Sequence, residues 1–199
     1  MNLRLFFLLI FLSFKTVSFS KTLNKETTPP IISDNSVKIF WLDENGTFHI
    51  NETYIKTLTE QQRAALGYIT TFVGNDCDWD GDKKTDESNL KCKLLAALDL
   101  GYQCSEKHLS FLRKWFKGDK KILEDLQDCK RTPNTANSQD SFTELKMTTA
   151  HNTITIIYSA IGQDRRRNQK WQWTEESTFT FTKNEIKRTN RKNSNGGFN

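Results

Sequence analysis

One short segment places acidic residues at spacings that fit a divalent cation. Residues 76–87 read DCDWDGDKKTDE, with carboxylates at positions one, three and five, glycine at six and glutamate at twelve. Carboxylates at these positions converge on one hard cation, the glycine permits a sharp bend, and the last glutamate can chelate with both oxygens. We therefore expect calcium as a cofactor, in a structural role because no second such loop occurs. A solvated acidic turn is the alternative.

This pattern resembles the calcium loop of EF-hand proteins, including the helices expected on either side. Two positions depart from the family pattern: Cys77 stands at position two, and Lys83 replaces the apolar residue usual at position eight. The resemblance implies five calcium ligands. Asp76, Asp78, Asp80 and Glu87 would bind through their side chains, and Asp82 would bind through its backbone carbonyl.

Four cysteines predict two disulfides. An even cysteine count in an exported chain favours disulfides, and the spacings lack the short pairs of structural zinc sites, which are the alternative. Cys77 and Cys92 flank the turn between the first two expected helices. Cys104 and Cys129 stand at the start and the end of an expected antiparallel helical hairpin. We therefore favour the pairings Cys77–Cys92 and Cys104–Cys129 among the three that four cysteines allow.

Residues 1–20 have the layout of a signal peptide. An early cation, Arg4, precedes an apolar run too short to cross a bilayer, and Ser18 and Ser20 offer a small-residue cleavage pattern. We expect cleavage after Ser20, with Ser18 as the alternative, and a secreted or periplasmic mature chain without a membrane span. An uncleaved or buried helix is the competing interpretation, although Lys15 interrupts the apolar run.

The formal charge of +5 is distributed unevenly over the 199 residues. Removal of residues 1–20 leaves +3, and residues 163–199 alone carry +5, so residues 21–162 sum to −2. The basicity of the whole chain is therefore a weak argument for a nucleic-acid partner.

Cations and aromatic side chains gather near the start of one C-terminal strand. Such mixtures are typical of surfaces that bind single-stranded nucleic acid or anionic glycans, and export makes nucleic acid the poorer partner. We expect an anionic glycan or an unknown protein as partner, and a solvated hairpin loop is the alternative. The cluster comprises Arg165, Arg166, Arg167, Lys170, Trp171 and Trp173.

Two kinds of apolar periodicity divide the chain and predict an α+β fold. Helical spacing and capping residues predict helices over 60–74, 88–100, 105–117 and 119–129. Period-two alternation then predicts strands over 141–149, 153–161, 170–182 and 185–190, joined as a four-stranded antiparallel meander packed on the helices. Before the helices, residues 37–50 suggest a hairpin that turns at Asn45-Gly46, or a short extended entry.

This periodicity also gives the domain organisation. A signal peptide is followed by a flexible arm, a helical region with two disulfides, an antiparallel β region and a disordered tail. Their respective bounds are 1–20, 21–36, 37–131, 141–190 and 191–199.

Helices followed by a meander whose late strand reads TFTFTKNEIKR, at 178–188, resemble the nuclear-transport-factor-2-like family. Members of that family are small-ligand binders or enzymes built around a conical pocket. We can match none of their catalytic residues in this chain, so the resemblance implies a pocket and leaves a ligand binder and an enzyme both open.

No catalytic constellation is visible in the sequence. His49, His108 and His151 lie far apart, and the chain contains no G-x-S-x-G, H-E-x-x-H or phosphate-binding glycine loop. We expect an exported, non-catalytic binding or interaction protein, with a pocket-containing ligand binder or enzyme as the alternative. A cavity lined by convergent polar groups favours the pocket, and a filled interface between sheet and helices excludes it.

Overall fold

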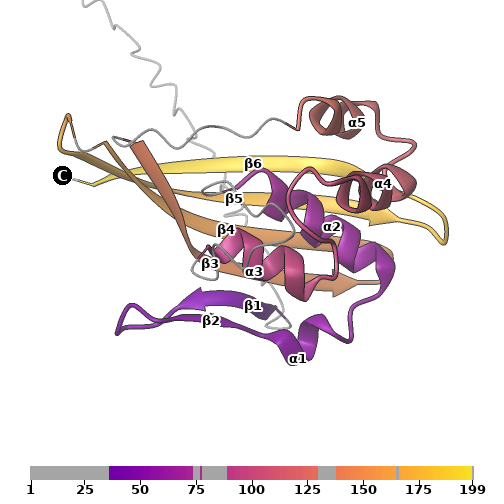
Figure 1. Ribbon diagram of the computed structural model, residues 1–199, viewed down its shortest axis with the longest axis horizontal. Coiled ribbons are helices and arrows are strands. Elements are labelled where there is room, and N and C mark those ends of the chain that lie inside the picture. Colours follow the sequence, from indigo (N-terminus) through magenta and orange to yellow (C-terminus); the bar gives the residue numbers. More distant parts are fainter. Residues whose placement is uncertain (1–35, 74–76, 78–88, 130–137, 165, 199) are drawn as a thin grey trace, which may run out of the picture. The chain divides into compact units, whose positions relative to one another are not determined.

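In the computed structural model, the helices lie on one face of an antiparallel sheet (Figure 1), which confirms the expected α+β class. The expected signal peptide, residues 1–20, and all but the last residue of the expected arm lie outside the described part. The structure describes residues 36–73, 77, 89–129, 138–164 and 166–198, all within one unit that spans residues 33–199.

Within the described ranges the sheet has six strands, in the order β2-β1-β3-β4-β5-β6, so the expectation of four was wrong. β3 to β6 form the expected meander, but the N-terminal hairpin joins it because β1 pairs with β3, with Phe40 opposite Leu145. The hairpin turns where expected, at Gly46, whose φ of 77° suits glycine. The strands are β1 (Val37–Leu42), β2 (Phe48–Ile50), β3 (Ser138–Ala150), β4 (Thr153–Asp164), β5 (Gln169–Phe181) and β6 (Ile186–Phe198).

The last strand includes most of the segment expected to be a disordered tail. β6 continues through residues 191–198 and pairs with β5 along its whole length, ending with Phe198 opposite Lys170. The expectation of disorder for 191–198 was wrong because β5 is itself long, and the backbone groups along its edge bind the polar segment regardless of its composition.

Among the residues that the structure describes, five helices lie between β2 and β3. The four expected helices are present, each with shorter bounds, and a one-turn helix after β2 was not expected. Side-chain caps explain where they start: Thr59 and Gln62 form a capping box before α2, and Ser105 caps α4. The helices are α1 (Glu52–Ile55), α2 (Glu60–Thr71), α3 (Leu90–Ala97), α4 (Glu106–Trp115) and α5 (Lys120–Gln127).

Both disulfides have the expected pairing. Cys77 is joined to Cys92 in α3, and Cys104, which precedes α4, is joined to Cys129, which follows α5. The second bridge therefore closes the α4–α5 hairpin from end to end. Among the described residues, no helix is both long and apolar enough to cross a membrane.

The core lies between the helices and the inner face of the sheet. Phe179 of β5 is fully buried and contacts the rings of Phe116 and Tyr68, with centroids 6.0 and 6.2 Å away. Because side chains alternate along a strand, Trp171 and Trp173 share the inner face with Phe179, whereas Lys170 and Gln172 point to the outer face. The inner face of β5 therefore carries most of its aromatic side chains, whereas Lys170 and Gln172 make its outer face polar.

Candidate functional site

A cavity of about 200 Å³ lies between the inner face of the sheet and two helices. One wall is apolar and comes from the last turn of α2, and the other side is polar and comes from β4, β5, β6 and α5. The lining residues are Tyr68, Ile69, Phe72, Val73, Asp125, Tyr158, Glu175, Arg188 and Arg191.

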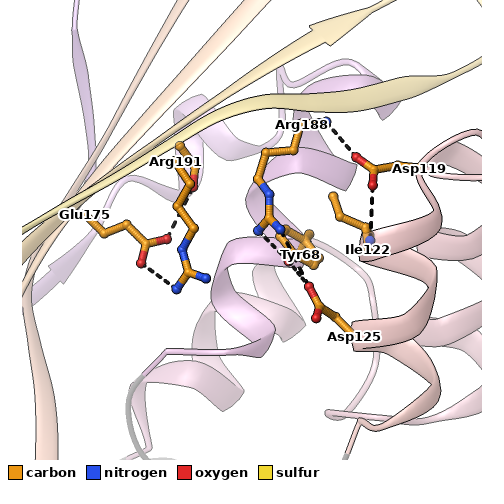
Figure 2. A network of polar contacts seen from close by, with 8 residues as sticks. Tyr68, Asp119, Ile122, Asp125, Glu175, Arg188 and Arg191 are labelled. Carbon is orange, nitrogen blue, oxygen red and sulfur yellow. Dashed lines mark hydrogen bonds and ion pairs between the residues drawn. The ribbon is translucent and has the colours of Figure 1, made fainter.

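The first polar group of the cavity joins α2, α5 and β6 (Figure 2). The Tyr68 hydroxyl donates to Asp125 Oδ2 at 2.7 Å and accepts from Arg188 Nη1 at 2.7 Å. Arg188 Nη2 lies 3.7 Å from the same Asp125 oxygen, and the guanidinium stands 5.3 Å from the centre of the Tyr68 ring. With only 8% of its side chain exposed, Arg188 is held by partners on two helices.

One carboxylate positions the helix that supplies Asp125. Asp119 Oδ1 caps α5 by accepting from the backbone N–H of Ile122 at 3.1 Å, while Oδ2 accepts from the backbone N–H of Arg188 at 2.9 Å. The start of α5 is therefore fixed to the backbone of β6, as Figure 2 shows. This link sets the distance between Asp125 and Arg188.

The second polar group is an ion pair between neighbouring strands. Arg191 Nη2 of β6 donates to Glu175 Oε2 of β5 at 2.8 Å. The two side chains differ sharply in exposure, since 5% of Glu175 but 50% of Arg191 is accessible. Glu175 thus acts as a buried anchor, and Arg191 presents its other N–H groups at the cavity.

Further donors surround the buried carboxylate. Ser177 Oγ donates to Glu175 Oε1 at 3.3 Å, and the Asn193 amide, oriented to satisfy both groups, donates to Oε2 at 2.8 Å. The Tyr158 hydroxyl also contacts Glu175, and the Trp173 indole contacts that hydroxyl in turn. The polar network therefore continues along the sheet from the cavity to Trp173.

Burial and charged neighbours keep Tyr68, Tyr158 and Arg191 in their protonated forms. Burial, and next the contact with Asp125, raises the pKa of Tyr68, while burial and then the charge of Glu175 raise that of Tyr158. Glu175 in turn raises the pKa of Arg191. Both phenols are therefore protonated donors at neutral pH, and the two carboxylates of the lining, Asp125 and Glu175, each face an arginine.

The expected anionic-ligand cluster is divided between different surfaces. Arg166 and Arg167 lie in the β4–β5 turn, where their backbone N–H groups donate to Asp164 Oδ1 at 2.9 and 3.2 Å. Lys170 points to the outer face, while Trp171 and Trp173 point to the inner face. Arg165 lies outside the described residues.

The expected calcium loop lies outside the described residues, apart from Cys77. The four aspartates and the glutamate that are expected as ligands therefore remain a sequence prediction. Within the described ranges, no group of three or more His, Cys, Asp or Glu side chains is arranged to hold a metal ion.

A separate polar cluster surrounds His108, which is fully buried in α4. Its Nδ1 accepts from the backbone N–H of Cys104 at 3.1 Å, and its Nε2 lies 3.0 Å from Thr71 Oγ1. Because Thr71 donates its own proton to the carbonyl of Gly67, His108 must carry its proton on Nε2. This histidine joins α2 and α4 and has no access to the cavity lining.

Sequence reasoning missed the residues that line the cavity. Asp125, Glu175, Arg188 and Arg191 look like ordinary charges in the sequence. One signal was available: Glu175 occupies an inward position of an alternating strand, between Trp173 and Phe179, where an apolar residue is expected.

Comparison with known proteins adds no assignment to this geometry. No protein-family model matches the chain, and neither the curated proteins nor the solved structures include a significant match to it.

Proposed function

We propose that this chain is an exported, non-catalytic binding protein that holds a small polar ligand in the cavity between α2, α5 and the inner face of the sheet. The disulfides support an oxidising compartment such as the periplasm or the extracellular medium. The cavity favours the pocket that the nuclear-transport-factor-2-like resemblance implies over an interface filled by side chains.

The observation that carries this proposal is the Glu175–Arg191 pair. Burial of a carboxylate costs several kcal/mol in desolvation, and an apolar pair at the same place would stabilise the sheet at least as well. The pair is arranged so that Glu175 accepts from protein donors while Arg191 stays half-exposed at the cavity. A fixed, half-exposed cation at a cavity is a recognition element for a ligand that carries hydrogen-bond acceptors.

The size of the cavity limits the ligand. Pockets for drug-sized compounds usually measure about 300–1,000 Å³. A cavity of about 200 Å³ takes a smaller compound, or one unit of a longer one that continues beyond it.

A matched pair of variants tests the proposal. Arg191→Met keeps the aliphatic stem and removes the donors, whereas Lys192→Met removes the neighbouring cation, whose partner Glu176 is on the outer face. We expect small neutral polyols, amides and carboxylic acids, titrated into ¹⁵N-labelled protein, to include compounds that shift the amide signals of Tyr68, Phe72 and Arg191. Arg191→Met should weaken such binding roughly tenfold or more, because a hydrogen bond to a charged donor is lost.

The control distinguishes binding at the cavity from a general effect of charge. Lys192→Met should bind as the wild type does. The double variant Glu175→Gln/Arg191→Met removes the carboxylate that Arg191→Met alone would leave without its cation, and it should also lose binding. Equal binding by wild type and both Arg191 variants would overturn the proposal, as would a complete lack of shifts.

We also propose a structural calcium ion bound by residues 76–87. The support is the spacing of the carboxylates and the Cys77–Cys92 bridge, which ties position two of that segment to the first turn of α3. A fixed end reduces the conformational entropy that the segment loses when it closes on an ion.

A further inference from the structure

Resting on the proposed function, we propose that the ligand is a neutral saccharide, and that its binding surface continues from the cavity along β5 over Trp173 and Trp171. The cavity holds one sugar unit, and the two indoles take the units that follow. This strip of Trp171, Trp173, Tyr158, Glu175 and Arg191 is called the inner strip below.

The register of the sheet makes an open aromatic platform on its inner face. Trp173 stands opposite Ala160 on β4, and Trp171 stands opposite Gly162 on β4 and Gly197 on β6. Trp171 therefore has glycine on both neighbouring strands, whereas Trp173 stands opposite Asn195 on β6 and packs against the core on one side. Neither ring has an aromatic stacking partner among the described residues. Both side chains have intermediate exposure.

The two indoles are neighbours on one face of β5. Residues two apart on one face of a strand are separated by about 7 Å, so the two rings can contact different units of one linear ligand. A sugar ring presents C–H groups on one face, and these pack on the face of an aromatic ring without requiring charge. Trp173 also touches Tyr158, so the platform meets the lining of the cavity without a gap.

The charges of the cavity fit hydroxyl groups better than an ion. Its lining carries two cations, Arg188 and Arg191, and two carboxylates, Asp125 and Glu175, so it is neutral in sum. A hydroxyl both donates and accepts a hydrogen bond, and neighbouring sugar hydroxyls therefore match a site that offers donors beside acceptors. An anion would gain from Arg191 but would be repelled by Glu175, 2.8 Å from that guanidinium.

The exposed cations near the β4–β5 turn do not make the inner strip selective for anions. Lys170 points to the opposite face of the sheet, and Arg167 is drawn toward Asp164, with 3.8 Å between Nε and Oδ2. The inner face thus contributes aromatic rings, and the turn contributes cations on its own surface.

The indole N–H signals of the five tryptophans provide the test. Glucose, galactose, N-acetylglucosamine and their linear trimers are titrated into ¹⁵N-labelled full mature chain, beside glucuronate and inorganic phosphate. We expect at least one neutral trimer to shift the indole signals of Trp171 and Trp173 and the amide of Arg191. It should bind more tightly than its monomer.

Variants on one strand separate the two faces. Trp171→Ala should weaken trimer binding roughly five- to tenfold, because one stacking platform is lost. Trp173→Phe, which keeps an aromatic core contact and shortens the platform, should weaken it less. Gln172→Ala lies between the two on the outer face and should bind as the wild type does.

The possible results distinguish this inference from the proposed function. The polyols, amides or acids of the first test could shift the cavity signals while no neutral saccharide does. That result would overturn the saccharide proposal and leave the proposed binding function intact. Binding of glucuronate or phosphate alone also overturns it. If nothing binds, both proposals fail. Unchanged trimer binding in Trp171→Ala would place the sugar elsewhere and overturn the inner strip.

Discussion

At the scale of single residues, His108 shows how burial fixes a proton. Burial lowers the pKa of His108 to about 4, and the positive charge of Lys91 acts in the same direction. The neutral ring accepts from Cys104 through Nδ1, so protonation there would remove that hydrogen bond as well as bury a charge. Cys104 carries a disulfide and a positive φ of 61°, so the affected turn is tightly constrained.

We expect this residue to make the folded protein sensitive to acid. An unfolded histidine has a pKa of about 6.5, so the stabilising effect of neutral His108 is complete above that pH. As the pH falls from 6.5 to 4, the unfolded chain binds a proton that the folded chain excludes, and the free energy of unfolding should drop by ~3 kcal/mol. Urea denaturation of wild type and His108→Asn at a series of pH values measures this difference.

In His108→Asn the free energy of unfolding should depend less on pH between 6.5 and 4. The asparagine amide oxygen can still accept from Cys104, and the amide does not titrate. His151→Asn is the matched control, since His151 is exposed in the β3–β4 turn with a φ of 52°, which asparagine tolerates. The control should keep the wild-type slope. A wild-type slope in His108→Asn would show that another group causes the acid sensitivity.

At the scale of elements, Asp119 joins a helix to the edge of the sheet. One carboxylate oxygen caps α5 and the other accepts from the backbone of β6. Asp119→Asn keeps an oxygen that can cap α5, but its NH₂ group then faces the backbone N–H of Arg188, so that two donors meet. Asp119→Ala loses both contacts.

We therefore expect a graded loss of stability. Asp119→Asn should lower the free energy of unfolding by ~1–2 kcal/mol, and Asp119→Ala by about 1 kcal/mol more, because the helix cap is lost too. Urea denaturation measures both values. Asp128→Ala, at the exposed C-terminal end of the same helix, should leave stability unchanged or slightly higher, because it removes a negative charge from the negative end of the helix dipole. Equal losses in the two Asp119 variants would contradict the double role.

The elements differ in how far local sequence determines them. The helices were predictable because caps such as Thr59 and Asp119 and an apolar periodicity act within a few residues. The disulfides followed from where those helices end. The last eight residues of β6 could not be predicted as a strand from the sequence, because they include almost no apolar residues. This part of the strand forms through backbone pairing with β5.

The candidate site was less predictable than the fold. Its polar residues come from α2, α5 and three strands, and no spacing in the sequence reveals that Asp125 and Arg188 meet. Only Glu175 was noticeable in the sequence, because it is a charged residue at an inward-facing position of a strand. The acidic segment 76–87 differs from the cavity, because the spacing of its residues alone predicts a metal site there.

At the scale of the whole molecule, calcium should stabilise the fold if residues 76–87 bind it. A ligand at one hundred times its Kd stabilises the folded state by about 2.7 kcal/mol, which raises Tm. We expect a higher Tm in calcium than in EDTA for wild type, and little difference for Glu87→Gln, which loses the bidentate ligand. Asp86→Asn, at a position that supplies no side-chain ligand, should respond as the wild type does.

Calorimetric titration of calcium into both variants checks that the change in Tm reflects binding. Absence of heat and of any change in Tm with the wild type would remove the calcium proposal. A full response by Glu87→Gln would place the ion elsewhere.

The pairing of β1 with β3 has a consequence for how the sheet closes. Phe40 and Leu145 are opposite each other, although all five helices lie between them in the chain. Closing so long a loop is entropically costly and makes folding slow. Both disulfides fall inside that loop and bypass 15 and 25 residues of it. The two disulfides therefore shorten the stretch of chain that separates the two halves of the sheet.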